Sequence, residues 1–157
     1  MTPRNSAHAL LLKLSRLPGG LRVFSILVCF KAPFFGSVRP RFNELRPGFG
    51  RATIKKRRAV TNHLGTVHAI AMANLCEYVA GTLMEVSIAP DMRWIPKGMN
   101  IEYLAKAPTD VTATCVIDDI DWTETQDVHL NIDVHDIDGN RVAAAIVPMY
   151  VSPKKGR

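Results

Sequence analysis

One carboxylate stands inside the longest apolar stretch of this sequence. Ala, Met, Leu, Val and Ile fill most positions from residue 67 to 83, no proline interrupts them, and Glu77 lies in the middle. This composition favours a helix, and a helix that is apolar on nearly all sides is normally buried on nearly all sides. Because burying an isolated charge is very costly, Glu77 is predicted to be paired, protonated or functional.

Small and polar residues surround Glu77 on its predicted helix face. Asn74 precedes it by three positions and Gly81 follows it by four, so these side chains are neighbours on a helix. Such a face leaves room for a ligand, and a partly buried glutamate there can act as a general base or a nucleophile. The alternative is a structural ion pair with a cation on a neighbouring strand. Glu85, nearer the helix end, is predicted to be a surface charge.

A polar turn, Asn62-His63-Leu64-Gly65-Thr66, leads into this helix near Val67. Free N–H groups at a helix start can stabilise a carbonyl oxygen as it gains negative charge, which points to the backbone of residues 67–69. His68 lies nine positions before Glu77 and therefore roughly opposite it on the helix, so the two cannot form a dyad within one helix. His68 either holds the loop or meets a site across a dimer interface. Asn62 either caps the turn or orients a water molecule or a thioester oxygen.

The turn and the helix together resemble the acyl-CoA thioesterases of the hotdog fold, of the phenylacetate-pathway type. The match consists of Asn62, Gly65, Thr66, Val67, His68 and Glu77. Many members of that family have His-Gly-Gly where this chain has His68-Ala69-Ile70. The chain is therefore closer to another branch of the superfamily than to the studied enzymes.

This resemblance covers residues 34–151 and implies hydrolysis of the thioester of an acyl-CoA to a free acid and coenzyme A. Glu77 would be the general base or nucleophile, the amides of Val67, His68 and Ala69 would polarise the carbonyl, and Asn62 would position the water. Gly65 would shape the catalytic turn, and Asn74 and Gly81 would line the substrate site. Coenzyme A is then part of the substrate, and neither a separate cofactor nor a metal is expected.

The resemblance also implies a partner, because hotdog domains cover their central helix by pairing. A homodimer or a dimer of dimers is therefore expected. The altered His68-Ala69-Ile70 favours an alternative of a different class, namely a non-catalytic acyl- or CoA-binding or assembly module of the same fold.

The polarity pattern by itself predicts an α+β layer. Strands are expected at 37–46 and 48–58, then the long helix to about residue 86, then four strands within residues 92–151. Because short turns join the last four strands, they should form an antiparallel sheet on which the helix buries its apolar surface. Pro96-Lys97-Gly98 predicts a bulge or kink, and Pro148 an edge or bulge position. The resemblance implies that this α+β layer is the hotdog fold, in which the sheet wraps around the central helix.

Four consecutive cations, Lys55, Lys56, Arg57 and Arg58, end the second predicted strand. They charge both faces of the strand, so the chain is predicted to leave the sheet there. They either contact the nucleotide phosphates of coenzyme A or form a solvated strand end.

With 157 residues, the chain is predicted to be one domain with an N-terminal helical extension (1–33), a hotdog domain (34–152) and a basic tail (153–157). Residues 1–33 contain no Asp or Glu and favour helices at 7–17 and 21–30. These are expected to pack on the domain. The alternatives are peripheral membrane contact and a targeting peptide; the second run is too short to span a bilayer.

Charge is distributed unevenly along the chain. Residues 1–60 hold thirteen Lys/Arg and one acid, whereas residues 61–157 hold seven Lys/Arg and thirteen acids. The basic part could attract a nucleotide phosphate, an acidic lipid or a nucleic acid, or it could serve solubility alone. A nucleic-acid binder is the third functional hypothesis, but no aromatic nucleic-acid signature is present, so nucleic acid is not an expected partner.

Three widely spaced cysteines, Cys29, Cys76 and Cys115, lie in apolar settings without a CxxC pair. They are predicted to be buried free thiols of a reducing compartment, which favours the cytoplasm. His129, Asp133 and His135 share one strand face, and they are predicted to be solvent-exposed polar residues rather than metal ligands.

Overall fold

The computed structural model describes residues 4–118 and 120–154, and within them the chain forms three α-helices, two short 3₁₀ helices and seven strands. The elements are α1 (Ser6–Leu14), α2 (Gly20–Lys31), η1 (Pro33–Ser37), β1 (Arg41–Arg46), β2 (Phe49–Ile54), η2 (Arg58–Val60), α3 (Ala69–Ser87), β3 (Met92–Pro96), β4 (Asn100–Tyr103), β5 (Val111–Val116), β6 (Gln126–Asp136) and β7 (Arg141–Pro153).

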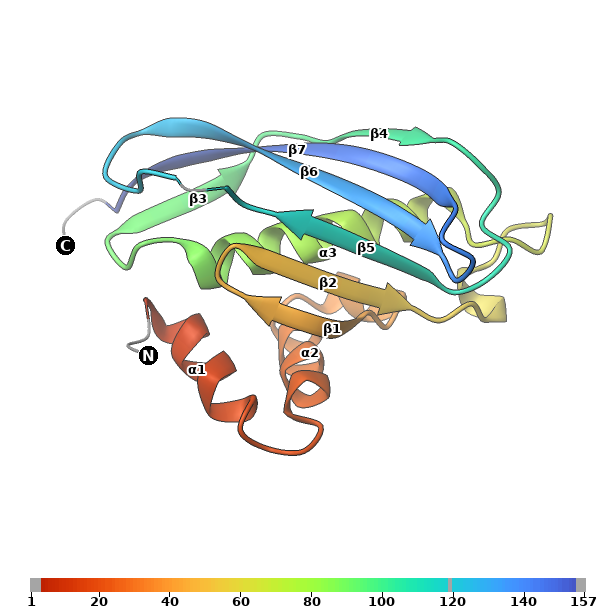
Figure 1. Ribbon diagram of the computed structural model, residues 1–157, viewed down its shortest axis with the longest axis horizontal. Helices are drawn as coiled ribbons and strands as arrows, with labels where there is room; N and C mark the ends of the chain where they lie inside the picture. Colours follow the sequence, from red (N-terminus) through yellow and green to blue (C-terminus); the bar gives the residue numbers. More distant parts are fainter. Residues whose placement is uncertain (1–3, 119, 155–157) are drawn as a thin grey trace.

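The strands form one antiparallel sheet in the order β1-β2-β5-β6-β7-β3, and β4 pairs with β7 beside β3. The sheet curves over α3, which runs along its inner face (Figure 1). This confirms the predicted α+β class and the predicted hotdog arrangement, a sheet wrapped around a long central helix.

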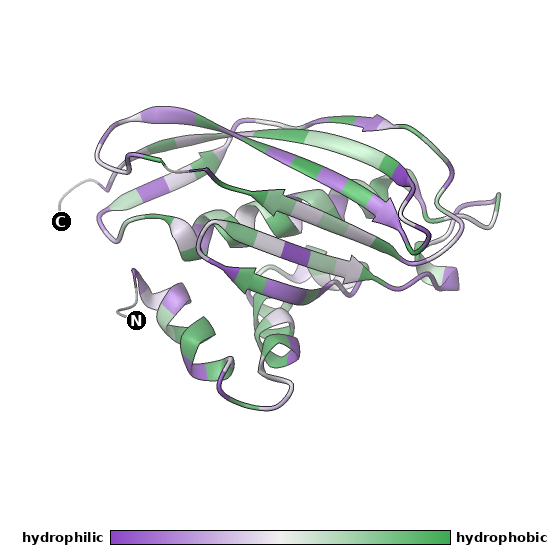
Figure 2. Ribbon diagram, viewed as in Figure 1, coloured by the Kyte–Doolittle hydropathy of each residue, from purple (hydrophilic) through white to green (hydrophobic). Residues whose placement is uncertain are grey.

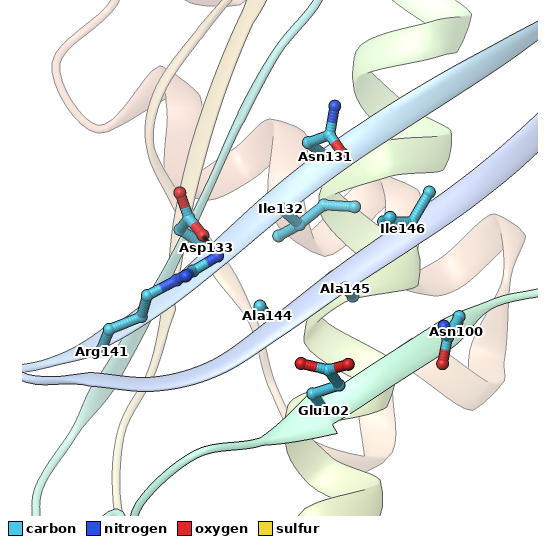
Figure 3. Close-up of a pocket in the computed structure, with 9 residues that line it drawn as sticks. All are labelled: Asn100, Glu102, Asn131, Ile132, Asp133, Arg141, Ala144, Ala145 and Ile146. Carbon is cyan, nitrogen blue, oxygen red and sulfur yellow. Dashed lines mark ion pairs between the residues drawn. The ribbon is translucent and has the colours of Figure 1, made fainter.

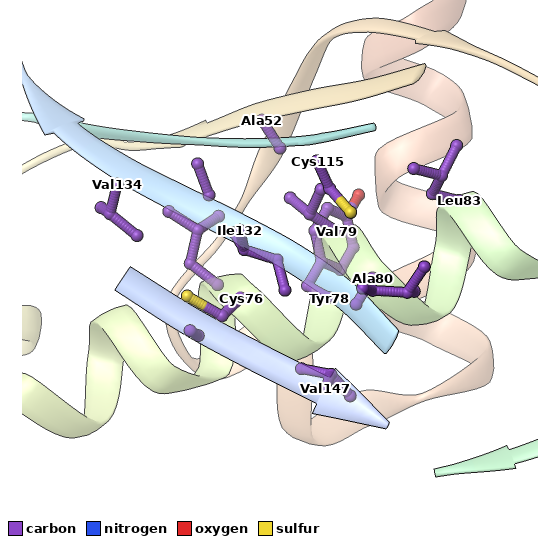
Figure 4. Close-up of a cluster of buried hydrophobic side chains, with 14 of the residues drawn as sticks. Ala52, Cys76, Tyr78, Val79, Ala80, Leu83, Cys115, Ile132, Val134 and Val147 are labelled. Atoms are coloured by element: carbon purple, nitrogen blue, oxygen red, sulfur yellow. The ribbon is translucent and has the colours of Figure 1, made fainter. Parts of the chain in front are cut away.

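The core lies between α3 and the inner face of the sheet. Side chains from α3 such as Cys76, Val79 and Leu83 are fully buried and meet Ile132 and Val147 from the two longest strands (Figure 4). Alternate residues along β6 are buried and exposed, as expected for a sheet with one face on a core and the other toward solvent. Burial of this apolar surface, at about 25 cal/mol per Å², is the main force that holds helix and sheet together.

The predicted strand at 92–106 is interrupted, as its Pro96-Lys97-Gly98 sequence indicates. β3 and β4 both pair with β7 and are separated by residues 97–99. Pro148 lies in β7 opposite this break, where its carbonyl accepts a hydrogen bond from the N–H of Lys97 at 2.9 Å. Within a strand, the N–H and C=O of one residue point to the same neighbour. The N–H that Pro148 lacks would therefore face the break, which confirms the predicted bulge position.

The second helix, α2, covers the β1 edge of the sheet, and α1 packs against α2 and α3 (Figure 1). The backbone N–H of Phe42 in β1 donates to Oγ of Ser25 in α2 at 3.0 Å, so α2 satisfies an edge donor that no strand reaches. The two helices therefore pack on the domain, as the first of the three alternatives predicted. Among the described residues, no helix is long and apolar enough to cross a bilayer.

The segment before α1 is tied to the far end of α3. The Arg4 guanidinium donates to the carbonyl of Ser87 at 3.0 Å, and the Asn5 amide donates to the carbonyls of Glu85 at 2.8 Å and Ile88 at 3.0 Å. Carbonyls in the last turn of a helix lack partners within the helix. The N-terminal segment thus satisfies the C-terminal end of the central helix.

Two predicted strand boundaries are wrong. The first strand begins at Arg41 rather than at residue 37, because residues 33–37 form η1 and Arg39 has a φ of 54°, a left-handed conformation that a strand cannot contain. The second strand ends at Ile54. Lys55 to Arg58 follow outside the sheet, as their charge on both faces predicts.

Candidate active site

The turn before α3 is closed by the side chain of Asn62. Its Oδ1 accepts hydrogen bonds from the backbone N–H of Leu64 at 3.0 Å and of Thr66 at 3.2 Å, and its Nδ2 lies 3.0 Å from Oγ1 of Thr66. Gly65 has a φ of 72°, which favours glycine at this position. Of the two predicted alternatives for Asn62, the structure shows the turn-capping one.

The backbone donors at the start of α3 are not equally free. The N–H of Val67 donates to the carbonyl of Ala107 at 2.9 Å, and the N–H of His68 donates to the carbonyl of Val60 at 2.8 Å. The N–H of Ala69 has no protein acceptor in the part of the chain that the structure describes. The predicted set of three backbone donors is therefore reduced to one, at Ala69.

His68 caps the helix. It precedes the first helical residue, and its Nδ1 accepts a hydrogen bond from the N–H of Ile70 at 3.0 Å. An N-cap side chain of this kind satisfies one of the donors that the first turn leaves open. The imidazole is exposed, so its Nε2 is accessible at the surface. The structure thus gives His68 a structural role and places it at the same end of α3 as Ala69.

Glu77 is exposed, which corrects the expectation that the helix buries it. A stripe along α3 is exposed at Ile70 and Glu77 and half-buried at Ala73 and Gly81; the other residues of the helix are buried except Ala69 and Glu85 near its ends, which are half-buried. We call Ile70, Ala73, Glu77 and Gly81 the α3 stripe. The helix was predicted to be buried on nearly all sides because its composition is apolar, but within one chain this stripe remains uncovered.

The neighbours of Glu77 differ from the small-residue pocket that the sequence predicts. Gly81 lies under the ring of Trp94 from β3, because a Cβ at this position would be 3.1 Å from that ring. The Trp94 indole N–H donates to the carboxylate of Glu85 at 2.8 Å. Gly81 therefore makes room for Trp94 rather than for a ligand, and Glu85 is a half-buried acceptor rather than a plain surface charge.

Asn74 faces the segment that follows α2. It is 5% exposed, its Nδ2 is 3.4 Å from the carbonyl of Phe34, and its Oδ1 has no hydrogen-bond partner among the described residues. The spacing from Glu77 predicts that Asn74 lies at the site. No pattern in the sequence predicts its contact with Phe34, which lies in η1, 40 positions earlier in the chain.

A hollow of about 210 Å³ opens beside the start of α3. It is lined by Phe34, Ser37, Val38, Ala59, Val60, Thr61, His68, Ile70, Ala71 and Asn74. Its walls thus come from η1, η2 and the first turns of α3, segments far apart in the sequence. Of the predicted site residues, His68 and Asn74 line it, and Asn62 and Ala69 adjoin lining residues in the chain.

The four cations Lys55 to Arg58, the last of which begins η2, lead in the chain to Ala59 and Val60 of this hollow. The Lys56 ammonium donates to the carbonyl of Pro108 at 2.8 Å, and the Arg57 guanidinium donates to the carbonyl of Ser37 at 2.8 Å. These two side chains therefore hold loops. Lys55 and Arg58 are exposed, and no protein acceptor in the described ranges holds their side chains. The structure thus divides the predicted phosphate-binding set into two loop-holding and two available cations.

A second hollow lies on the outer face of the sheet, away from α3 (Figure 3). It is centred on the small residues Ala144 and Ala145 of β7, and Glu102 of β4 and the ion pair between Arg141 and Asp133 border it. None of the predicted site residues lines it.

The cysteines offer no nucleophile. Burial raises the pKa of Cys76 and of Cys115 to about 12, and for Cys76 the nearby Cys115 adds to the effect. Both thiols are therefore neutral near pH 7, and all three cysteines are free. Among residues 4–118 and 120–154, no three His, Cys, Asp or Glu side chains are grouped closely enough to hold a metal ion.

Comparison with known protein families identifies the family of this chain. Residues 20–151 match the family described as Domain of unknown function (DUF4442). The chain belongs to the DUF4442 family. The match includes α2 as well as the sheet and α3. A comparison with curated proteins found no match.

Solved structures of similar fold match most of the chain. The structural-genomics protein APC5556 is 40% identical, with a TM-score of 0.83 over 94% of this chain and 99% of that one. Pseudomonas aeruginosa PA5026, described as a probable thioesterase, is 21% identical, with a TM-score of 0.76 over 88% and 97%. A hypothetical thioesterase of Streptococcus pneumoniae, solved with coenzyme A, is 18% identical, with a TM-score of 0.64 over 82% and 99%. These likenesses confirm the hotdog fold and the resemblance to thioesterases of that fold.

The donor at Ala69 can be removed without disturbing the helix. Proline is tolerated at the first helical position, and the N–H of Ala69 makes no bond that Ala69→Pro would break. We therefore expect Ala69→Pro to leave the free energy of unfolding within about 0.5 kcal/mol of wild type. Ile70→Pro is the matched control, because it removes the N–H that His68 caps and should cost about 1 kcal/mol. Urea denaturation measures both, and a large loss in Ala69→Pro would show that its N–H has a structural partner.

Proposed function

We propose that this DUF4442 protein is an acyl-CoA thioesterase, which hydrolyses the thioester to a free acid and coenzyme A. The observation that carries the proposal is that α3 presents both a backbone donor and a carboxylate. The N–H of Ala69, at the helix start, has no acceptor among the described residues, and the carboxylate of Glu77 is exposed in the α3 stripe. A donor and a carboxylate are what an acyl transfer to water requires. The similarity to a probable thioesterase and to a hypothetical thioesterase solved with coenzyme A supports the same class.

These two groups are too far apart to act on one carbonyl within one chain. Eight residues separate Ala69 from Glu77, which is about 12 Å along a helix, whereas a catalytic contact spans about 3 Å. Two copies related by a two-fold axis, with their α3 helices antiparallel, would place Glu77 of each near the start of the other helix. We therefore propose a homodimer whose two sites are each shared by both chains.

The surface around the stripe supports that pairing. The outer side of β3 and β4 has no strand partner among the described residues, and an open edge is a ready template for pairing with another chain. This edge borders the α3 stripe, because Trp94 of β3 covers Gly81 and the Tyr103 hydroxyl of β4 donates to the carbonyl of Ala69 at 3.1 Å. A partner that pairs with the edge would also cover the stripe, where Ile70 is 61% exposed.

In the proposed reaction, Glu77 removes a proton from a water molecule whose oxygen attacks the carbonyl carbon. The carbonyl oxygen becomes negative and is stabilised by the Ala69 N–H and the positive end of the α3 dipole. The carbon–sulfur bond then breaks, and the proton passes to the departing thiolate. Attack by the Glu77 carboxylate itself, followed by hydrolysis of the anhydride, is the other route that this geometry permits. Asn62 acts indirectly, by holding the turn.

We further propose that coenzyme A lies along the hollow beside η2, with its phosphates near Lys55 and Arg58. All three cysteines are free; Cys76 and Cys115 are buried as predicted, whereas Cys29 is half-buried. Free thiols suit a reducing compartment, and we propose the cytoplasm. A specific observation favours a second candidate function, a non-catalytic acyl-CoA-binding module. Ile70, next to Ala69 in the chain, is exposed and lines the hollow, at a position where many related enzymes have glycine.

Replacing Glu77 distinguishes between the two candidate functions, a thioesterase and a non-catalytic binding module. Glu77→Gln keeps the side-chain shape and removes the base, and one general base contributes about 10²–10⁴-fold. Turnover of a panel of acyl-CoAs, followed by thiol release, should therefore fall by at least about a hundredfold while the melting temperature stays the same. Glu124→Gln, an exposed acid in the β5–β6 loop, is the matched control and should keep full activity.

If Glu77→Gln keeps the parent's activity, the proposed mechanism is wrong. If the parent binds acyl-CoA but releases no thiol from any member of the panel, the binding module is the function.

The exposed cations next to η2 should act on binding rather than on chemistry. Their contacts would lie far from the reacting carbon, and such contacts hold ground and transition states equally. Lys55→Gln combined with Arg58→Gln should therefore raise KM several-fold at low salt and leave kcat nearly unchanged. Lys13→Gln combined with Arg16→Gln removes the same charge from the α1 end as a control. A KM that does not move at low salt would mean that the phosphates bind elsewhere.

A further inference from the structure

The outward face of α2 is apolar. Val23, Ile26, Leu27 and Phe30 recur at helical spacing and therefore share one side of the helix, and all four are exposed, Ile26 by 59% and Phe30 by 87%. The opposite side of α2, with Phe24 and Ser25, is buried against β1. We call these four residues the α2 apolar face. Soluble monomers rarely expose clustered large apolar side chains unless something covers them.

Cations flank this face on both sides. At 100° per residue, Arg22 lies beside Ile26 and Lys31 lies beside Leu27 on the helix surface. Residues 4–43 contain seven Lys/Arg and no Asp or Glu. No ion pair in the described ranges involves Arg22 or Lys31. Both helices project from the sheet below β1, with hydrophobic residues along them (Figure 2).

We propose that the α2 apolar face docks the protein on the surface of an anionic phospholipid bilayer. A helix with one large apolar side and Lys/Arg at its borders lies in the plane of a membrane interface, where the apolar side enters the acyl boundary and the cations meet the headgroups. The charge of this segment is complementary to an anionic surface. The proposal does not depend on the thioesterase activity, since it concerns binding alone.

A second copy of this chain is a poorer occupant. In a two-fold dimer the same patch meets itself, which would bring Arg22 and Lys31 of both copies together in a segment that contains no acid. In addition, the dimer proposed above uses β3 and β4, at the other end of the strand order from β1, which α2 covers.

Docking would also orient the hollow. η1 follows α2 directly, and its Phe34, 71% exposed, lines the hollow beside α3. A protein held by α2 would therefore present that opening close to the bilayer, where acyl chains are found.

The test is co-sedimentation of the full chain with vesicles of phosphatidylcholine, with and without phosphatidylglycerol. We expect binding to the anionic vesicles that weakens as salt rises and little binding to the neutral ones. Ile26→Gln combined with Phe30→Gln should weaken binding at least about tenfold, because two large apolar side chains no longer enter the interface. Arg22→Gln combined with Lys31→Gln should weaken it and flatten its salt dependence.

The matched control is Val116→Gln combined with Ile137→Gln, which removes two exposed apolar side chains, one from β5 and one from the β6–β7 turn, and should bind as wild type. The proposal is overturned if the chain ignores anionic vesicles or if the Ile26 and Phe30 variant binds them unchanged. It is equally overturned if that variant turns a dimer into a monomer in sedimentation without vesicles, since the face would then be an interface between copies.

Discussion

The need to cover α3 is the constraint on which the rest of the structure depends. A 19-residue helix that is apolar on most sides cannot remain in water, and one sheet face covers only part of it. The curved sheet takes the largest share, through side chains of β2, β5, β6 and β7. Phe35 of η1 and Phe42 of β1 cover a further part, where both pack on the Tyr78 ring. What remains is the narrow α3 stripe that holds Glu77, so the candidate site is the part of the helix that one chain leaves uncovered.

The two ends of α3 and one edge of the sheet are also covered by other parts of the chain. The Arg4 and Asn5 side chains satisfy carbonyls at one end of α3, and His68 caps the other. At the sheet, α2 covers the β1 edge, whereas β3 and β4 stay open. Within the described residues, the Ala69 N–H at the start of α3 and the outer side of β3 and β4 are left without backbone partners. A site shared between two copies would lie between them.

Much of this could be predicted from the sequence, because it depends on local patterns. The alternation in β6, the break at Pro96-Lys97-Gly98, and the cations that end β2 each follow from residues that are close in the chain. The surroundings of the site could not be predicted, because they depend on distant segments. The role of Gly81 is set by Trp94, the donors of Val67 and His68 are used by Ala107 and Val60, and Phe34 reaches Asn74 from the N-terminal side. The exposure of Glu77 was missed because composition shows how apolar a helix is but not which side its neighbours leave open.

The central claim is that Ala69 of one copy and Glu77 of the other form one active site. Co-expression of the Ala69→Pro and Glu77→Gln chains tests it most directly. Each variant alone should retain at most about 1% of wild-type turnover. In a mixed dimer, one of the two shared sites combines an intact Ala69 with an intact Glu77. If half of the dimers are mixed, the preparation should recover about a quarter of wild-type activity. Activity that stays at the level of the single variants, in a preparation shown to contain mixed dimers, would contradict the shared site.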